Sequence, residues 1–143
     1  MHSPQRTLVL IDPSSPDGEN GIDVIGADEP TVTLLLLLDH VSAAPVEQFA
    51  DAERISLQNA AEIYLQQVAD RVQGRHAVDL VSTVGHDYVG EILHAARRSR
   101  ATRIVVPWTM PGLGANAVAH LADLSDVPVR FAPPLAALSR RGS

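Results

Sequence analysis

The chain has 143 residues, of which 45% are hydrophobic and 20% charged, which is enough for one globular domain with a full core and too few for a second. It contains no Cys, and all 11 of its basic residues are Arg, so disulfides, thiol nucleophiles and phosphate-loop or Schiff-base lysines are excluded. A formal net charge of −6 argues against nucleic acid as a main partner.

The amino terminus does not have the sequence pattern of a targeting signal. Residues 1–6 lack a charged segment followed by an apolar one, as a signal peptide would have. The longest apolar run, residues 34–38, is far shorter than the roughly 20 residues that span a bilayer. We therefore expect a cytoplasmic protein with no membrane role.

The first predicted strand, residues 7–11, is a continuous apolar run that ends at Asp12-Pro13, as in a strand buried on both faces. Residues 13–30 are rich in Pro, Gly and acidic residues and contain no basic residue, which predicts a loop. Within this loop Ile22, Val24 and Ile25 are apolar, and they fit either a short strand or an anchor that holds the loop to the core.

Residues 31–38 predict a central strand, because β-branched residues precede a run of only five leucines. Residues 45–73 predict one long amphipathic helix, since they contain no Gly and no internal Pro and carry apolar residues three and four apart. A third strand is expected over residues 77–84, closed by Gly85.

The second half of the chain repeats the alternation of helix and strand. A helix is expected to begin at His86 or Asp87 and to end near Arg97, Arg98 and Arg100, whose charges suit the negative end of a helix dipole. The remaining predicted elements are a strand over 103–108, a glycine-containing loop over 109–114, a helix with Asn116 as its N-cap, a strand over 127–132 and a flexible tail over 133–143.

Strands that alternate with helices predict a single α/β domain over residues 1–143, with a five-stranded, mostly parallel open sheet and helices on its faces, as in Rossmann-like folds. In such sheets a ligand crevice forms outside the carboxyl ends of the strands. The candidate site therefore comprises Asp12-Pro13, residues 39–41, Gly85-His86 and residues 107–116.

The order of elements resembles the universal stress protein (UspA-like) family. The resemblance rests on the first strand with Asp12, on residues 31–73, on the strand and helix around Gly85, and on residues 104–106 followed by Gly112-Leu113-Gly114 and a last helix. It implies an adenine-nucleotide-binding type of α/β fold and a homodimer, commonly formed through the last strand. In some members of this family it also implies bound ATP or AMP.

In nucleotide-binding members an Asp at the end of the first strand contacts adenosine, and backbone after the second strand meets the base. A loop of the form Gly-x2-Gly-x9-Gly-(Ser/Thr) holds phosphate and ribose. By this resemblance the candidate cofactor-binding residues are Asp12, Pro13, Asp39, Val41, Gly112, Gly114, Ala115 and Asn116. The loop departs from the family pattern, because one residue separates its glycines and Ala115 stands where the family has a hydroxyl residue.

A shortened loop offers few backbone N–H groups to a phosphate, and no Lys adds positive charge. We therefore expect a non-catalytic regulatory or interaction protein without a cofactor. The alternatives are an ATP- or AMP-binding universal stress protein and, third, an unrelated small α/β enzyme. The sequence contains no Gly-x-Ser-x-Gly motif and no histidine pair with metal-ligand i, i+4 spacing, so we expect neither catalytic residues nor a metal.

We also expect a homodimer and a further, unidentified protein partner. The missing helix between the first two strands would leave one face of the leucine strand, residues 34–38, uncovered. Either Ile22, Val24 and Ile25 cover that face, or a second subunit does.

Overall fold

Five strands and four α-helices make up most of the part of the chain that the computed structural model describes, namely residues 5–14, 18–25, 31–38, 43–72, 77–85, 87–107 and 114–132. In chain order the elements are β1 (Arg6–Ile11), the 3-10 helix η1 (Asn20–Val24), β2 (Thr31–Leu38), α1 (Ala44–Glu53), α2 (Leu57–Asp70), β3 (Ala77–Val84), α3 (Tyr88–Ser99), β4 (Arg103–Val106), α4 (Ala115–Leu124) and β5 (Val129–Phe131).

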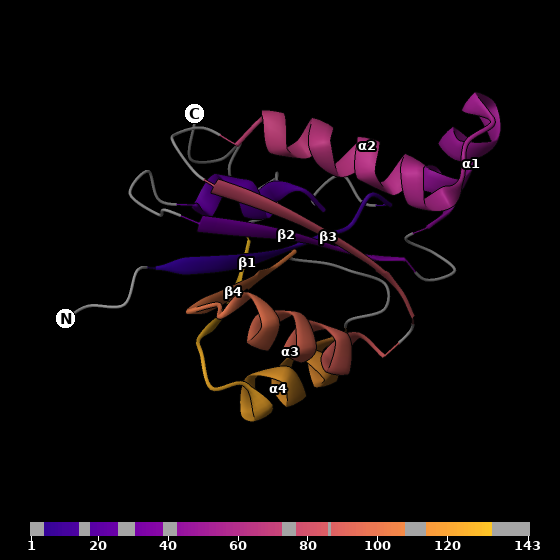
Figure 1. Ribbon diagram of the computed structural model, residues 1–143. Helices are drawn as coiled ribbons and strands as arrows, with labels where there is room; N and C mark the ends of the chain where they lie inside the picture. Colours follow the sequence, from indigo (N-terminus) through magenta and orange to yellow (C-terminus); the bar gives the residue numbers. More distant parts are fainter. Residues whose placement is uncertain are drawn as a thin grey trace, which may run out of the picture.

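The strands form one sheet in the order β3-β2-β1-β4-β5, and every neighbouring pair is parallel. Helices α1 and α2 cover one face of the sheet, and α3 and α4 cover the other (Figure 1). Val9 of β1 lies opposite both Leu34 of β2 and Val105 of β4, so β1 is the central strand. The expected α/β fold class is confirmed, and the sheet is parallel throughout its five described strands.

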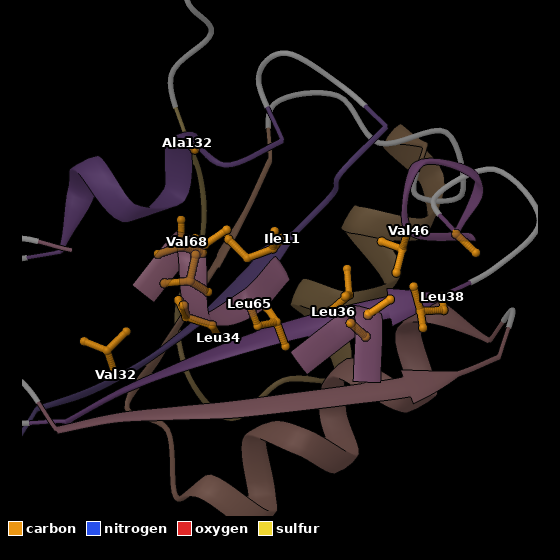
Figure 2. Packing of buried hydrophobic residues seen from close by; sticks show 14 of the residues in the cluster. Ile11, Val32, Leu34, Leu36, Leu38, Val46, Leu65, Val68 and Ala132 are labelled. Carbon is orange, nitrogen blue, oxygen red and sulfur yellow. The ribbon is translucent and has the colours of Figure 1, made fainter. Parts of the chain in front are cut away.

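The apolar runs of β1 and β2 supply both faces of the core. Figure 2 shows Leu34, Leu36 and Leu38 pointing to the side of α1 and α2, where Leu65 and Val68 pack against them. The alternate side chains of the same strands belong to the cluster on the α3 and α4 side. Burial of each leucine stabilises the fold by about 1.5–3 kcal/mol relative to exposure, which explains why these runs form strands inside the sheet.

Part of the predicted loop is helical, because η1 occupies Asn20–Val24. Ile22, Val24 and Ile25 pack against the core cluster on the α1 and α2 side, so of the two alternatives the loop anchor is right and the short strand is wrong. Since these side chains cover the sheet within one chain, the argument that a second subunit must cover it no longer applies.

Two contacts fix η1 on the sheet. A Cβ at Gly21 would lie 2.5 Å from Cγ1 of Val9, so glycine permits the close approach of η1 to β1. Arg103 donates from Nε to Oγ1 of Thr7 and from Nη2 to the Val24 carbonyl, both at 2.8 Å. The start of β4 therefore holds the end of η1 in place.

The predicted long helix over 45–73 is wrong, because two helices occupy this segment. Arg54 adopts the left-handed conformation with φ of 55° and ends α1. Ser56 then caps α2, its Oγ accepting a hydrogen bond of 3.1 Å from the Asn59 N–H. A serine that satisfies the first N–H groups of a helix favours a new helix start over continuation.

Several predicted ends also shift. Asp87 is the N-cap of α3 as expected, since its side chain accepts from the Gly90 N–H. Asn116 is not the N-cap of α4; Gly114 takes that position in an extended conformation. The strands β4 and β5 are shorter than predicted, ending at Val106 and Phe131, and Trp108 and the tail 133–143 lie outside the described residues.

Candidate functional site

The strand order of the sheet changes direction between β1 and β4. It builds β2 and β3 on one side of β1, then crosses to β4 and β5 on the other side. In open parallel sheets this switch point, at the carboxyl ends of the strands, is where a crevice forms. Asp12 directly follows β1 there, and Pro107 directly follows β4.

Five of the eight candidate residues lie in the described part of the chain. Asp12 and Pro13 lie at the carboxyl end of β1, and Gly114, Ala115 and Asn116 lie at the start of α4. Asp39, Val41 and Gly112 lie outside the described residues, as do His40 and His86. The topology therefore brings the Asp12 segment and the start of α4 to the same edge of the sheet.

The Asp12 carboxylate is held by its own loop. The residue is fully buried, and Oδ1 accepts hydrogen bonds from the N–H of Ser14 at 2.9 Å and from its hydroxyl at 2.6 Å. This is an Asx turn, in which a side chain replaces a backbone turn bond. Oδ2 is buried and has no hydrogen-bond partner among the described residues. Half of the carboxylate is thus satisfied locally, and the other half is left without a donor.

The backbone closes the same loop from the other side. The N–H of Asp12 donates to the Gly18 carbonyl at 3.0 Å. A Cβ built on Gly18 would lie only 1.7 Å from the Asp12 carbonyl oxygen, so no other residue fits this conformation. Gly18 is therefore required for the tight return of the chain over Asp12.

Glu19 links this loop to α2. The Tyr64 hydroxyl donates to Oε2 of Glu19 at 2.7 Å, and Arg71 forms an ion pair with Oε1. Burial of Tyr64, followed by its hydrogen bond to Glu19, raises the pKa of the phenol well above its ordinary value. Tyr64 therefore remains a protonated donor throughout the physiological pH range.

A cavity of about 180 Å³ lies between Pro13, the start of α1 and α2. Its walls are mostly apolar and include Pro45, Phe49 and Tyr64, with the Gln67 amide as a polar group. Pockets for drug-sized ligands have volumes of about 300–1,000 Å³, whereas a cavity of about 150 Å³ holds a benzene ring. Among the described residues this space therefore fits one ring-sized group.

The start of α4 is open. Among the described residues, a Cβ at Gly114 would meet no atom within 4 Å, and no side chain caps the helix. Asn116, two residues after Gly114, is exposed. Within the part of the chain that the structure describes, this end of α4 attracts an anion through its backbone and dipole.

Comparison with known proteins gives matches among solved structures, whereas no family model and no curated protein matches the chain. The hypothetical protein PH0823 matches with a TM-score of 0.62 at 21% identity, over 90% of this chain and 96% of that one. A universal stress protein in complex with cAMP matches with a TM-score of 0.57 at 18% identity, over 92% and 98% of the two chains. The universal stress protein UspA from Lactobacillus plantarum matches with a TM-score of 0.54 at 17% identity, over 93% and 100%.

The chain has the universal stress protein fold. The resemblance inferred from the order of elements is thereby confirmed at the level of fold. Within the described residues, no helix of this universal stress protein fold is long and apolar enough to cross a membrane.

Sequence reasoning missed the residues that hold the Asp12 loop and η1 in place from positions far away in the sequence. Tyr64 and Arg71 reach Glu19 from 45 and 52 residues away, and Arg103 reaches Val24 from 79 residues away. No spacing rule for helices or strands links positions so far apart. The local Asx turn at Asp12 and Ser14 was accessible to sequence reasoning, because Asp followed by Pro and Ser favours such turns.

Proposed function

We propose that this chain is a regulatory or interaction protein with the universal stress protein fold, acting in the cytoplasm as a homodimer with a further protein partner. It performs no catalysis and needs no nucleotide cofactor. The observation that carries the proposal is the state of Asp12, the residue that the family resemblance assigns to adenosine. Its carboxylate is fully buried and already accepts two hydrogen bonds from Ser14.

The loop geometry explains why this state opposes nucleotide binding. A ribose hydroxyl would have to displace Ser14 from Oδ1 or reach the buried Oδ2, and either requires the loop that Gly18 closes to open. A polyphosphate would also need neutralising charge, and the sequence offers no Lys and a shortened glycine loop. The binding of ATP therefore costs loop opening without a matching gain in phosphate contacts.

A nucleoside or nucleoside monophosphate such as AMP is the second candidate. Two observations favour it: the buried Oδ2 lacks a donor, and a ring-sized cavity lies beside Pro13. A universal stress protein of the same fold has been solved in complex with cAMP. A ligand of this class would place its ring in the cavity and donate a hydroxyl to Asp12, with no demand on the glycine loop.

Thermal unfolding with and without nucleotide tests the proposal. A ligand at about 100 times its dissociation constant stabilises a protein by roughly 2.7 kcal/mol, which raises the melting temperature by several degrees. We expect no shift with millimolar Mg-ATP or AMP. A shift with AMP alone that disappears in Asp12→Ala would replace the proposal with the second candidate, and a shift with Mg-ATP would return the chain to the ATP-binding members.

The variant Ser14→Ala is a matched control for this experiment. It leaves Asp12 in place and removes the hydroxyl donor at 2.6 Å. If Asp12 is unused for ligands, Ser14→Ala lowers the melting temperature and creates no response to nucleotide. If Ser14 merely stands in for a ligand hydroxyl, Ser14→Ala strengthens the nucleotide shift.

A further inference from the structure

A groove with a volume of about 860 Å³ lies between β3 and α3. It forms because α3 packs on β1 and β2, whereas the helix that packs on β3 is α2, from the other face of the sheet. Sites for small molecules have volumes of about 300–1,000 Å³. The groove is therefore large enough for a ligand of several rings or residues.

The floor of the groove comes from alternate residues of two strands. In the register of the sheet, Thr33 lies opposite Asp79 and Leu35 lies opposite Val81. Leu35 belongs to the core cluster on the α3 side, so Asp79 and Val81 also point to that side. Val81 is 38% exposed. The floor thus has an exposed apolar centre and a carboxylate near the amino end of β3.

The wall of the groove is one stripe of α3. Glu91 and Arg98 line the groove, and their spacing of two helical turns places them on the same face. His94 and Ala95 lie between them. α3 runs from the carboxyl end of β3 to the amino end of β4, and Glu91 lies beside Gly85 at its beginning. The wall therefore carries a negative charge at one end and a positive charge about 10 Å further along the helix.

The charged groups of the groove are not paired within the described residues. No hydrogen bond or ion pair joins the side chain of Asp79, Glu91 or Arg98 to a residue that the structure describes. α3 itself supplies no partner, because Ala95 stands four residues after Glu91 and His94 four residues before Arg98, where opposite charges would pair. With two carboxylates and one guanidinium, the groove has a formal charge of −1.

We propose that the groove between β3 and α3 binds a free peptide of about three residues whose last residue is basic. An extended peptide of this length spans about 10 Å, which matches the separation of Glu91 and Arg98 along α3. The amino group of the peptide then lies at Glu91 and its terminal carboxylate at Arg98. The basic side chain of its last residue lies at Asp79, which is at the same end of the groove as Arg98.

The charge pattern disfavours simpler ligands. Asp79 would repel a phosphate or another multiply charged anion that approaches Arg98, and Arg98 would repel a polyamine that bridges the two carboxylates. A peptide with a basic last residue carries one negative and two positive charges, so it meets an opposite charge at each position. Its net charge of about +1 also neutralises the groove.

The middle of the groove suits the middle of such a peptide. Val81 and the small side chain of Ala95 offer apolar contact to a central side chain. The His94 ring carries an N–H that can donate to a peptide carbonyl. This site goes beyond the proposed function, since it gives an interaction protein a small ligand and depends on neither the homodimer nor nucleotide binding.

NMR titration of the isotope-labelled full chain with the tripeptide Ala-Leu-Lys tests the site. We expect the amide signals of Val81 and His94 to shift as the peptide is added. Three modified peptides each remove one charge, by acetylation of the amino group, by amidation of the carboxylate, or by replacement of the last residue in Ala-Leu-Ala. Each change should weaken binding by about fivefold or more, because each removes a hydrogen bond between charged groups.

Three variants show which residue meets each charge. Glu91→Gln should bind the free and the acetylated peptide equally, Arg98→Gln the free and the amidated peptide, and Asp79→Asn the peptides Ala-Leu-Lys and Ala-Leu-Ala. The matched control Arg97→Gln removes the neighbouring guanidinium, which lines a different pocket, and should bind Ala-Leu-Lys within about twofold of the wild type. The melting temperature of each variant shows that it is folded, and the modified peptides test the wild type without any substitution.

Three outcomes would overturn the proposal. One is the absence of shifted signals with Ala-Leu-Lys at about 10 mM. The second is equal binding of a peptide that is both acetylated and amidated, which would make the ligand an internal segment of another protein. The third is unchanged preference among the peptides in all three variants, which would place the binding elsewhere. Each outcome is independent of the thermal scans with nucleotide, so this site and the proposed function can fail separately.

Discussion

The loop after β1 and the groove between β3 and α3 hold polar side chains against the same sheet, yet they differ in how those groups are used. In the loop, Asp12 accepts from Ser14 and Glu19 accepts from Tyr64. In the groove, Asp79 and Arg98 have no side-chain partner among the described residues. One region thus uses most of its polar groups within the chain, and the other leaves them without a partner among the described residues.

The position of each strand in the sheet explains the difference. β1 lies in the middle of the sheet. Residues of η1 and α2 pack over it and so cover the loop that follows it. β3 lies at an edge, where one side of its backbone has no neighbour among the described strands. The difference between the two regions therefore follows from the place of each strand in the sheet order.

The largest expected effect is on the closed loop. Gly18→Ala introduces a Cβ 1.7 Å from the Asp12 carbonyl oxygen, so the loop must open and lose the hydrogen bond from Asp12 to residue 18. We expect the free energy of unfolding to fall by about 2–3 kcal/mol in urea titrations. The control Gly85→Ala, whose Cβ would meet its nearest atom at 3.7 Å, should change stability by less than about 1 kcal/mol. Equal effects of the two substitutions would show that the loop is not closed as described.

A smaller effect is expected where the loop meets α2. Tyr64→Phe keeps the ring in the cavity wall and removes the hydrogen bond of 2.7 Å to Glu19. Such a bond contributes about 1 kcal/mol net, so the melting temperature should fall by a few degrees. An unchanged melting temperature would mean that Glu19 does not hold the loop through Tyr64.

The stability difference between the wild type and Tyr64→Phe should depend on pH. The folded state raises the pKa of Tyr64, chiefly by burial and then by the Glu19 hydrogen bond, above the value of about 10 that holds in the unfolded chain. The stabilisation is therefore fully present below pH 10 and is lost as the pH rises further, since the unfolded chain releases the proton first. Urea titrations between pH 8 and 11 should show a steeper loss for the wild type than for Tyr64→Phe, and parallel curves would contradict this.

The smallest effect is expected in the groove. Asp79→Asn removes a carboxylate and His94→Gln an imidazole, neither of which forms an ion pair within the described residues, so the stability of the single chain should change by less than about 0.5 kcal/mol each. A loss above about 1 kcal/mol at dilution would show that the groove serves the fold of the single chain rather than a partner.

Sequence reasoning succeeded where the signal is local. The apolar runs that became β1 and β2 and the capping residue Asp87 depend on neighbours within a few positions. It failed at Arg54 and Ser56, because amphipathic spacing continues through the break while a left-handed residue and a serine cap end one helix and begin another. It also missed η1, whose five residues have no helix-forming composition and are held from outside by Arg103.

The amino-acid sequence by itself determined the succession of buried strands and amphipathic helices, and with it the parallel α/β class, because hydrophobic periodicity acts over a few residues. Only the tertiary structure decided that Glu19 meets Tyr64 and Arg71, that Arg103 holds the end of η1, and that β3 is an edge strand. Those features depend on contacts between segments some 45 residues or more apart or on the order of strands, and neither is encoded in the spacing of neighbouring residues.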